Sequence, residues 1–174
     1  MISVVIPTLN AAASLAETLT PLIHAAVEGL VREVVVADGG SRDATFEIAD
    51  DAGARFLNGD LAAGCEAAKG PWLLIVAPGA RLGSEWEAAA KAHMADHPKS
   101  AAYFRVALDD HRASARLKEA GAAIAGAFAW PKPEHGLLLS KRLYEEAGGD
   151  AGGALVRRIG RARLRPLPAR VYVT

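Results

Sequence analysis

The sequence predicts an α/β fold in which a mixed, mostly parallel sheet is flanked by helices. Three observations lead to this class. The chain has 174 residues, about the size of one domain. Short apolar runs alternate along it with segments of helical periodicity. Several of these runs, such as residues 2–6, lack the polar alternation of a half-exposed strand, which is typical of strands buried on both faces of a parallel sheet.

The first two elements are a strand and an amphipathic helix. Residues 2–6 form the β-branched strand, and apolar residues at three- and four-residue spacing predict a helix over residues 15–30. Asn10 and Ser14 are candidate caps of this helix. Pro21 lies inside it and predicts a kink or a late start.

The second apolar run, at residues 34–37, ends in a polar, glycine-containing turn at residues 38–41. Ser41 or Asp43 is expected to cap a helix that extends to about residue 52. The remaining elements are expected, in chain order, as strand 55–57, helix 61–69, strand 72–76, helix 85–96, strand 102–108, helix 112–127, loop 130–136, strand 137–139, helix 141–147, helical turns 155–160 and strand 170–174.

Composition excludes several classes of protein. Hydrophobic residues make up 51% of the chain and charged residues 23%, which is globular rather than disordered. Lysine plus arginine equals aspartate plus glutamate at 20 each, so we expect no nucleic-acid partner bound by bulk charge. Cys65 is the single cysteine and is expected to be a buried structural thiol, which excludes an internal disulfide and a cysteine-only metal site.

Targeting signals are not evident. No apolar run approaches the roughly 18 residues that a membrane span needs. Met1 is followed by a strand-like run rather than by a signal peptide. The expectation is a cytoplasmic protein of bacterial type.

Loops follow three of the predicted parallel strands, at residues 7–10, 38–43 and 77–80, and the first two of these loops carry polar side chains. Ligands of open α/β sheets bind outside the carboxyl ends of the strands. Asp38 can accept a hydrogen bond from a base or a ribose, and the two glycines after it allow close approach of a ligand. The alternative is that this segment is only a strand-to-helix turn with a cap. Neither a P-loop nor a dinucleotide fingerprint occurs.

Residues 3–10, SVVIPTLN, and 34–45, VVVADGGSRDAT, closely resemble the N-terminal half of bacterial family 2 glycosyltransferases, which have the type A nucleotide-sugar (GT-A) fold. Weaker matches continue in order through residues 155–161. The resemblance implies one domain over residues 1–174, with a nucleotide-binding half at 1–80 and an acceptor-side half at 81–174. It also implies transfer of a sugar from a nucleotide-diphosphate donor to an acceptor that the sequence does not identify. By this resemblance the nucleotide would be bound by Pro7, Thr8, Asn10, Asp38, Gly39 and Gly40.

The chain departs from the family at the positions that carry the chemistry. The family's acidic D-x-D or H-A-D motif, which holds a divalent cation on the diphosphate, reads Ala77-Pro78-Gly79 here. Alanine and glycine side chains cannot bind a hard cation. The acidic pair that supplies the catalytic base reads Ala151 and Gly152. We therefore predict no metal ligands and no cofactor, although Mg²⁺ or Mn²⁺ is usual in the family.

Two interpretations of these departures remain open. The first is a noncatalytic relative, a pseudoenzyme that keeps the fold and a nucleotide pocket or serves as a protein-interaction module. The second is a metal-independent transferase. In that case Arg81, Lys132 or Arg157 would neutralise the leaving diphosphate. Glu134 or His135 would serve as the base.

Two smaller patterns have functional and structural interpretations. Six arginines and no acidic residue follow Asp150. They could bind an anionic lipid or a protein partner, which would place the protein at the inner face of the membrane, or they could form a solvated face. His93 and His97 have a spacing that can bind zinc, but a solvated helix end is the expected structure.

Overall fold

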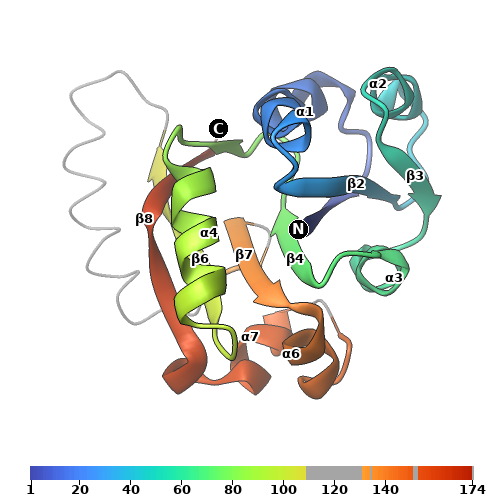
Figure 1. The fold of residues 1–174 in the computed structure, drawn as a ribbon. Coiled ribbons are helices and arrows are strands. Elements are labelled where there is room, and N and C mark those ends of the chain that lie inside the picture. The colour runs from blue at the N-terminus through green and yellow to red at the C-terminus, as the bar shows by residue number, and fades with distance from the viewer. Residues whose placement is uncertain (109–130, 134, 151–152, 174) are drawn as a thin grey trace.

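The structure is a computed structural model that describes residues 1–108, 131–133, 135–150 and 153–173. One mixed sheet of eight strands in the order β3-β2-β1-β4-β7-β6-β8-β5 forms its centre (Figure 1). The first half of the sheet is parallel, and β7 and β5 run against their neighbours. The strands are β1 (Ile2–Thr8), β2 (Val31–Asp38), β3 (Arg55–Asn58), β4 (Trp72–Val76), β5 (Arg81–Leu82), β6 (Ala101–Leu108), β7 (His135–Ser140) and β8 (Leu164–Val173).

Helices cover both faces of the sheet, which confirms the predicted α/β class. One core cluster joins one face of the sheet to α1, α2 and α4, and a second joins the other face to α3, α6 and α7. None of the described helices has the length and apolar character needed to cross a membrane. The helices are α1 (Ala12–Val27), α2 (Thr45–Asp51), α3 (Leu61–Ala67), α4 (Trp86–Asp96), α6 (Lys141–Glu146), α7 (Gly153–Ile159) and a 3₁₀ turn at Arg161–Arg163.

The carboxyl ends of six strands lie at one edge of the sheet. Thr8 of β1 is in register with Asp38 of β2, and Asp38 with Asn58 of β3. β4 runs parallel to β1 and ends at Val76, opposite the first residue of β7. Because β6 is antiparallel to β7 and parallel to β8, the last residues of β6 and β8 reach the same edge.

The sheet curls, because its far edge returns toward β4. β5 is the last strand in the order, yet only residues 77–80 separate it from β4. Five residue steps span at most about 18 Å, so Arg81 lies within that distance of Val76. Leu82 and Val171 from this far edge share a core cluster with Leu74 of β4. The curl therefore brings β5 and β8 back toward the loops of the parallel half.

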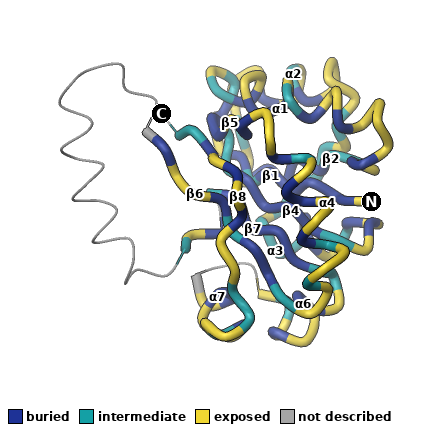
Figure 2. Tube along the Cα trace, turned by 60° about the vertical axis from the view of Figure 1, so that its left-hand side comes forward, coloured by how far each residue is buried: buried dark blue, intermediate teal, exposed yellow. Residues whose placement is uncertain are grey.

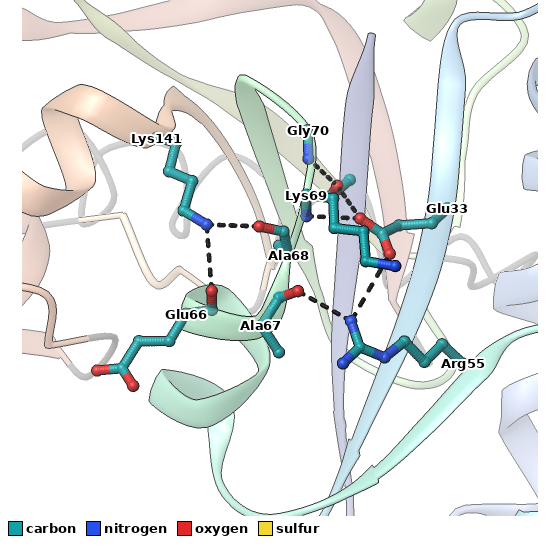
Figure 3. Close-up of polar contacts among 9 residues, drawn as sticks. Glu33, Arg55, Glu66, Ala67, Ala68, Lys69, Gly70 and Lys141 are labelled. Atoms are coloured by element: carbon teal, nitrogen blue, oxygen red, sulfur yellow. Dashed lines mark hydrogen bonds and ion pairs between the residues drawn. The ribbon is translucent and has the colours of Figure 1, made fainter.

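A cationic clamp holds the last turn of α3 at the opposite end of the sheet (Figure 3). The Lys141 ammonium donates to the carbonyls of Glu66, at 3.1 Å, and of Ala68. Arg55 donates from Nη1 to the carbonyl between them, that of Ala67, at 2.9 Å. Positive charge is favourable beside these carbonyls, which have no partner within the helix.

Glu33 of β2 connects the turn after α3 to β1. Its Oε1 accepts from the hydroxyl of Ser3, at 2.7 Å, and from the N–H of Lys69, at 2.6 Å. Burial opposes ionisation of this carboxyl, but these hydrogen bonds and the nearby cations outweigh burial and lower its pKa. The Ser3 hydroxyl in turn accepts from the N–H of Gly70, at 2.8 Å. The turn between α3 and β4 is thereby tied to the first strand.

Several predicted element boundaries and caps are wrong. The first helix begins at Ala12, not late, and it continues through Pro21. Its first N–H groups are not capped by Asn10 or Ser14; a carboxylate oxygen of Asp43 accepts from Ala12 at 3.0 Å. The two-residue strand β5 was not predicted, and β8 begins at Leu164 rather than at residue 170. The predicted helix at 112–127 and Trp130 lie outside the described residues.

His93 is buried rather than solvated, contrary to the expectation for the end of its helix. Only 5% of the residue is exposed, and its Nε2 lies 3.0 Å from the carbonyl oxygen of Ser100. Its ring packs edge-on against Trp72, with centroids 6.0 Å apart. Burial, together with nearby His97 and Arg165, lowers the pKa of His93. Cys65 is buried, as predicted, and burial raises the pKa of its thiol to about 12.

Candidate functional site

Asp38 is the centre of the loop that follows β2, and it is only 3% exposed. One carboxylate oxygen accepts from the hydroxyl of Thr8, at 2.9 Å, and from the hydroxyl of Ser41. The other accepts from the N–H groups of Gly40, at 2.9 Å, and of Ser41, at 2.7 Å. Burial disfavours the charged form, but these hydrogen bonds outweigh it and lower the pKa of Asp38.

These four donors occupy about all the acceptor positions that a carboxylate has. The primary role of Asp38 in the structure is therefore to fix the shape of the loop. The predicted cap of the next helix by Ser41 or Asp43 is wrong, because Ala44 is the N-cap residue of α2 and has no side-chain capping hydrogen bond. A base can reach the Asp38 carboxylate only when one of the two hydroxyls rotates away.

The loops after β1 and β2 are bonded directly to each other. Asn10, with a left-handed φ of 53°, accepts from the N–H of Arg42 at 2.9 Å and donates its own N–H to Ser41 Oγ at 2.7 Å. Ala11 donates to Thr45 Oγ1 at 2.9 Å. Ser41 and Thr45 accept hydrogen bonds from the loop after β1, and the sequence does not predict this role because it depends on where that loop lies.

The N–H groups of residues 10–12 and 39–42 in these two loops donate hydrogen bonds within the protein. Those of residues 10–12 bond to side chains of the second loop. Gly39 donates to the carbonyl of Thr8 at 2.8 Å, and residues 40–42 donate to Asp38 and Asn10. A phosphate group at these loops would have to displace existing bonds to be bound by the backbone.

We give the name nucleotide cradle, after the ligand that the sequence predicts there, to the surface of the two loops at Leu9, Asn10, Gly39 and Gly40. All four residues are exposed, and Leu9, a large apolar side chain, is 63% exposed. A Cβ at Gly40 would meet nothing within 4 Å, so the space above it is open. The φ of 102° at Gly40 also favours glycine. The cradle is thus preformed and accessible to a flat ligand.

The structure brings together all the residues that the resemblance assigns to the nucleotide. Beside the cradle, Pro7 is half-buried in β1, and Thr8 and Asp38 are buried beneath it. The positions agree with the resemblance, but the contact with a nucleotide stays a prediction.

The residues at the end of β4 do not fit a divalent cation. Residues 77–80, Ala-Pro-Gly-Ala, carry no side-chain oxygen, and the carbonyl of Ala77 accepts from the N–H of Ala80 at 3.2 Å and from the hydroxyl of Thr18 at 3.4 Å. In the part of the chain that the structure describes, no group of three or more His, Cys, Asp or Glu residues could hold a metal ion. Asp109 and Asp110 lie outside that part.

Of the two candidate bases, His135 is the one that the structure describes. It begins β7, half-buried, in register with Val76, the last residue of β4. Lys132 is exposed nearby in the chain, and its carbonyl accepts the N–H of His135 at 3.0 Å. Glu134 lies outside the described residues.

The other predicted cations lie apart from each other. Arg81 begins β5, with its guanidinium carbon 5.8 Å from the ring centroid of Tyr172. Arg157 is exposed on α7, which packs in the same cluster as α6. α6 begins next to the start of β4, where Lys141 donates its N–H to the Pro71 carbonyl at 2.8 Å. Residues 151 and 152, where the family has its acidic pair, are not described.

Comparison with solved structures finds the same fold in nucleotide-sugar transferases. S. aureus TarS 1–349 in complex with UDP-GlcNAc aligns with a TM-score of 0.73 and 15% identity, over 99% of this chain and 58% of that one. Glucosyl-3-phosphoglycerate synthase from Mycobacterium tuberculosis, in complex with Mn²⁺ and UDP-glucose, aligns with a TM-score of 0.66 and 18% identity, over 99% and 70%. Mannosyl-3-phosphoglycerate synthase from Rubrobacter xylanophilus aligns with a TM-score of 0.64 and 15% identity, over 95% of this chain and 64% of that one.

The chain thus spans about three fifths of the TarS 1–349 structures that it matches. No curated protein matches it in sequence. The model of the family described as glycosyl transferase family 2 matches residues 3–158, most of the chain. The chain therefore belongs to glycosyl transferase family 2.

Proposed function

We propose that this chain binds the nucleoside diphosphate part of a nucleotide sugar at the nucleotide cradle, without a divalent cation at the end of β4. The observation that carries the proposal is the preformed, exposed cradle, fixed from beneath by the buried Asp38. Structures with the same fold, TarS and glucosyl-3-phosphoglycerate synthase, have been solved with UDP-sugars. Because their identity to this chain is low, these structures support only the fold. The support for a nucleotide ligand comes from the cradle residues.

The physical character of the cradle favours a nucleobase. Leu9 offers an apolar surface, and the exposed glycines allow a planar ring to approach the backbone. Because the two loops are already hydrogen-bonded together, little conformational entropy is lost when a ligand binds.

Sugar transfer at this site would need a proton acceptor beside the end of β4. We assign this role to His135, whose position opposite Val76 supports it. Neutral imidazole would take the proton of the acceptor hydroxyl as that oxygen bonds to the anomeric carbon of the sugar. The bond from this carbon to the diphosphate oxygen would break, and the nucleoside diphosphate would leave with its electron pair. In the noncatalytic alternative, the protein binds a nucleotide at the cradle and transfers no sugar, so His135 has no catalytic role.

Calorimetric titration with UDP, GDP and dTDP, each with and without Mn²⁺, tests the binding proposal. We expect at least one of them to bind with an affinity that Mn²⁺ does not raise. Gly39→Val should abolish binding without lowering the melting temperature, because a Cβ there meets only the Thr8 carbonyl at 3.5 Å and Leu9 at 3.9 Å. Ala26→Val, on an exposed position at the far end of α1, is the matched control. Absence of binding, or binding that requires Mn²⁺, contradicts the proposal.

Turnover separates the two forms of the proposal. Wild-type protein is incubated with the UDP-, GDP- or dTDP-sugar whose nucleotide binds, in the presence of EDTA, and release of the nucleotide is followed. Hydrolysis or transfer that is lost in His135→Gln, with binding retained, supports the transferase. Binding without release in the wild type supports the noncatalytic module.

A further inference from the structure

Two arginines face each other across neighbouring strands at the carboxyl edge of the sheet. Arg105 of β6 and Arg170 of β8 are direct register partners, and both are exposed. Directly paired residues in a sheet project from the same face. Like charges placed directly opposite each other destabilise a sheet. The sheet therefore places two arginines side by side on one face, and this pairing does not stabilise the sheet.

A third arginine and a tyrosine extend this face. Tyr172 lies two residues after Arg170 and therefore projects from the same side of β8. Arg81 of β5 is the register partner of Tyr172, and its guanidinium lies over the Tyr172 ring. The intervening Val171 is fully buried in the core on the other face. We call Arg81, Arg105, Arg170 and Tyr172 the arginine platform; exposed stretches of β6 and β8 are visible in Figure 2.

Acidic partners distinguish Arg158 and Arg163, near the C-terminus, from the central pair Arg105 and Arg170. Arg158 lies 3.7 Å from a carboxylate oxygen of Asp150, and Arg163 lies 3.4 Å from one of Glu146. Within the described part of the chain, neither Arg105 nor Arg170 has an ion pair or a side-chain hydrogen bond. Two adjacent guanidinium groups with free donors match the charge and geometry of a phosphate group.

The position of the platform agrees with a phosphate-bearing ligand. It lies at the same edge of the sheet as the nucleotide cradle, and the curl brings Arg81 back toward the end of β4. The N–H groups of the cradle loops are already used, and residues 77–80 offer no metal ligand. A phosphate group at this edge therefore needs cationic side chains, and the platform supplies them.

We propose that the arginine platform is a phosphate-binding site, with Arg105 and Arg170 as its central pair. Its ligand is either the diphosphate of the nucleotide in the cradle or a phosphate group on a separate molecule. The proposal goes beyond the proposed function, because the platform can bind phosphate whether or not the cradle binds a nucleotide.

Titration with inorganic pyrophosphate, which has no base, tests the platform alone. We expect the wild type to bind it, with an affinity that falls as NaCl rises. The double variant Arg105→Gln/Arg170→Gln should bind at least ten-fold more weakly and should unfold at no lower temperature. Arg32→Gln, an exposed arginine at the other end of β2, should bind like the wild type. Failure of the wild type to bind pyrophosphate, or equal binding by the double variant, overturns the proposal.

Comparison of nucleoside and nucleoside diphosphate identifies the source of the phosphate. If the ligand is the diphosphate of the bound nucleotide, the affinity advantage of UDP over uridine collapses in the double variant. If the phosphate belongs to another molecule, that advantage is unchanged, and pyrophosphate and UDP bind to the wild type together. Pyrophosphate binding by a protein that binds no nucleotide would overturn the proposed function and leave the platform standing.

Discussion

At the scale of single residues, two buried polar side chains link the stability of this protein to pH. Asp38 accepts four hydrogen bonds and joins the ends of β1 and β2, while His93 is buried on α4 beside Trp72. The folded chain lowers the pKa of both groups, by hydrogen bonds at Asp38 and by burial at His93. Their titration therefore makes stability depend on pH in a direction that the structure sets.

Replacing Asp38 by asparagine should destabilise the protein by about 2–3 kcal/mol, as expected for lost charge-assisted hydrogen bonds. An amide offers one acceptor oxygen, and its NH₂ group would face the N–H groups of Gly40 and Ser41. Urea denaturation at pH 7 measures the change. Because the pKa of Asp38 is lowered in the folded state, the wild-type advantage is present above about pH 4, near the unfolded pKa, and is lost as pH falls through the folded pKa. Equal stability of the variant at pH 7 would contradict this role.

His93 predicts a second pH dependence at higher pH. Its pKa is lowered in the folded state, so between that pKa and about 6.5 the unfolded chain binds more protons. Stability should therefore decrease as pH falls below about 6.5. Denaturation of the wild type and of His93→Gln at pH 7.5, 6.5 and 5.5 measures this. The decrease should be smaller in the variant, and an identical pH profile would exclude His93 as its source.

At the scale of elements, close packing against the strands decides where helices lie. α3 approaches β1 and β2 at Gly64, where a Cβ would lie 2.7 Å from Val5 Cγ1 and 2.9 Å from Ala37 Cβ. Its last carbonyls are then bound by Lys141 and Arg55 (Figure 3). The helix is positioned by close contact on one side and by charge at its end.

Gly64→Ala should destabilise the protein by about 1–3 kcal/mol, the usual cost of overpacking. In an open helix position the same change would stabilise by about 1 kcal/mol, since alanine is the better helix former. Here the contacting atoms belong to buried strands that cannot move aside. Chemical denaturation measures the effect, and Glu66→Ala, on the exposed side of the same helix, is expected to stay within about 0.5 kcal/mol of the wild type. A stabilised Gly64→Ala protein would show that α3 can shift.

The sequence predicts those elements whose signals are local. The apolar runs of β1, β2 and β4 and the turn at Asp38 are visible without a structure. The cap of α1 is not, because Asp43 lies 31 residues from the N–H that it accepts. β5 has two residues and forms only because β8 is there to pair with it. Arg105 and Arg170 are likewise neighbours only because β6 and β8 are adjacent in the sheet. The hydrophobic pattern of the sequence predicts strands but not their order.

At the scale of the whole molecule, the curled sheet leaves a long stretch of β8 open at the edge that carries β5. β5 pairs only with Val171 and Tyr172, and no other described strand pairs with residues 164–169 of β8 on that side. This stretch contains Pro166 and Pro168, which have no N–H to offer another strand.

The double variant Pro166→Thr/Pro168→Thr should therefore self-associate. Threonine restores two N–H donors and favours extended backbone, so strands of neighbouring molecules can pair along this edge. Light scattering during incubation of the purified protein measures the effect against the wild type. Ala26→Val, which leaves the edge unchanged, should remain monodisperse under the same conditions. A variant as free of aggregates as the wild type would show that something other than the prolines protects β8.

The place of β8 within the sheet also affects how the chain folds during synthesis. β8 comes last in the sequence but lies between β6 and β5, two strands made much earlier. While a ribosome is still adding residues 164–173, β5 has no partner and β6 has an open edge. The parallel half at β1–β4 can form in that interval, but the curl cannot close. Until residues 164–173 are made, the second half of the nascent chain therefore offers strands whose partner is absent.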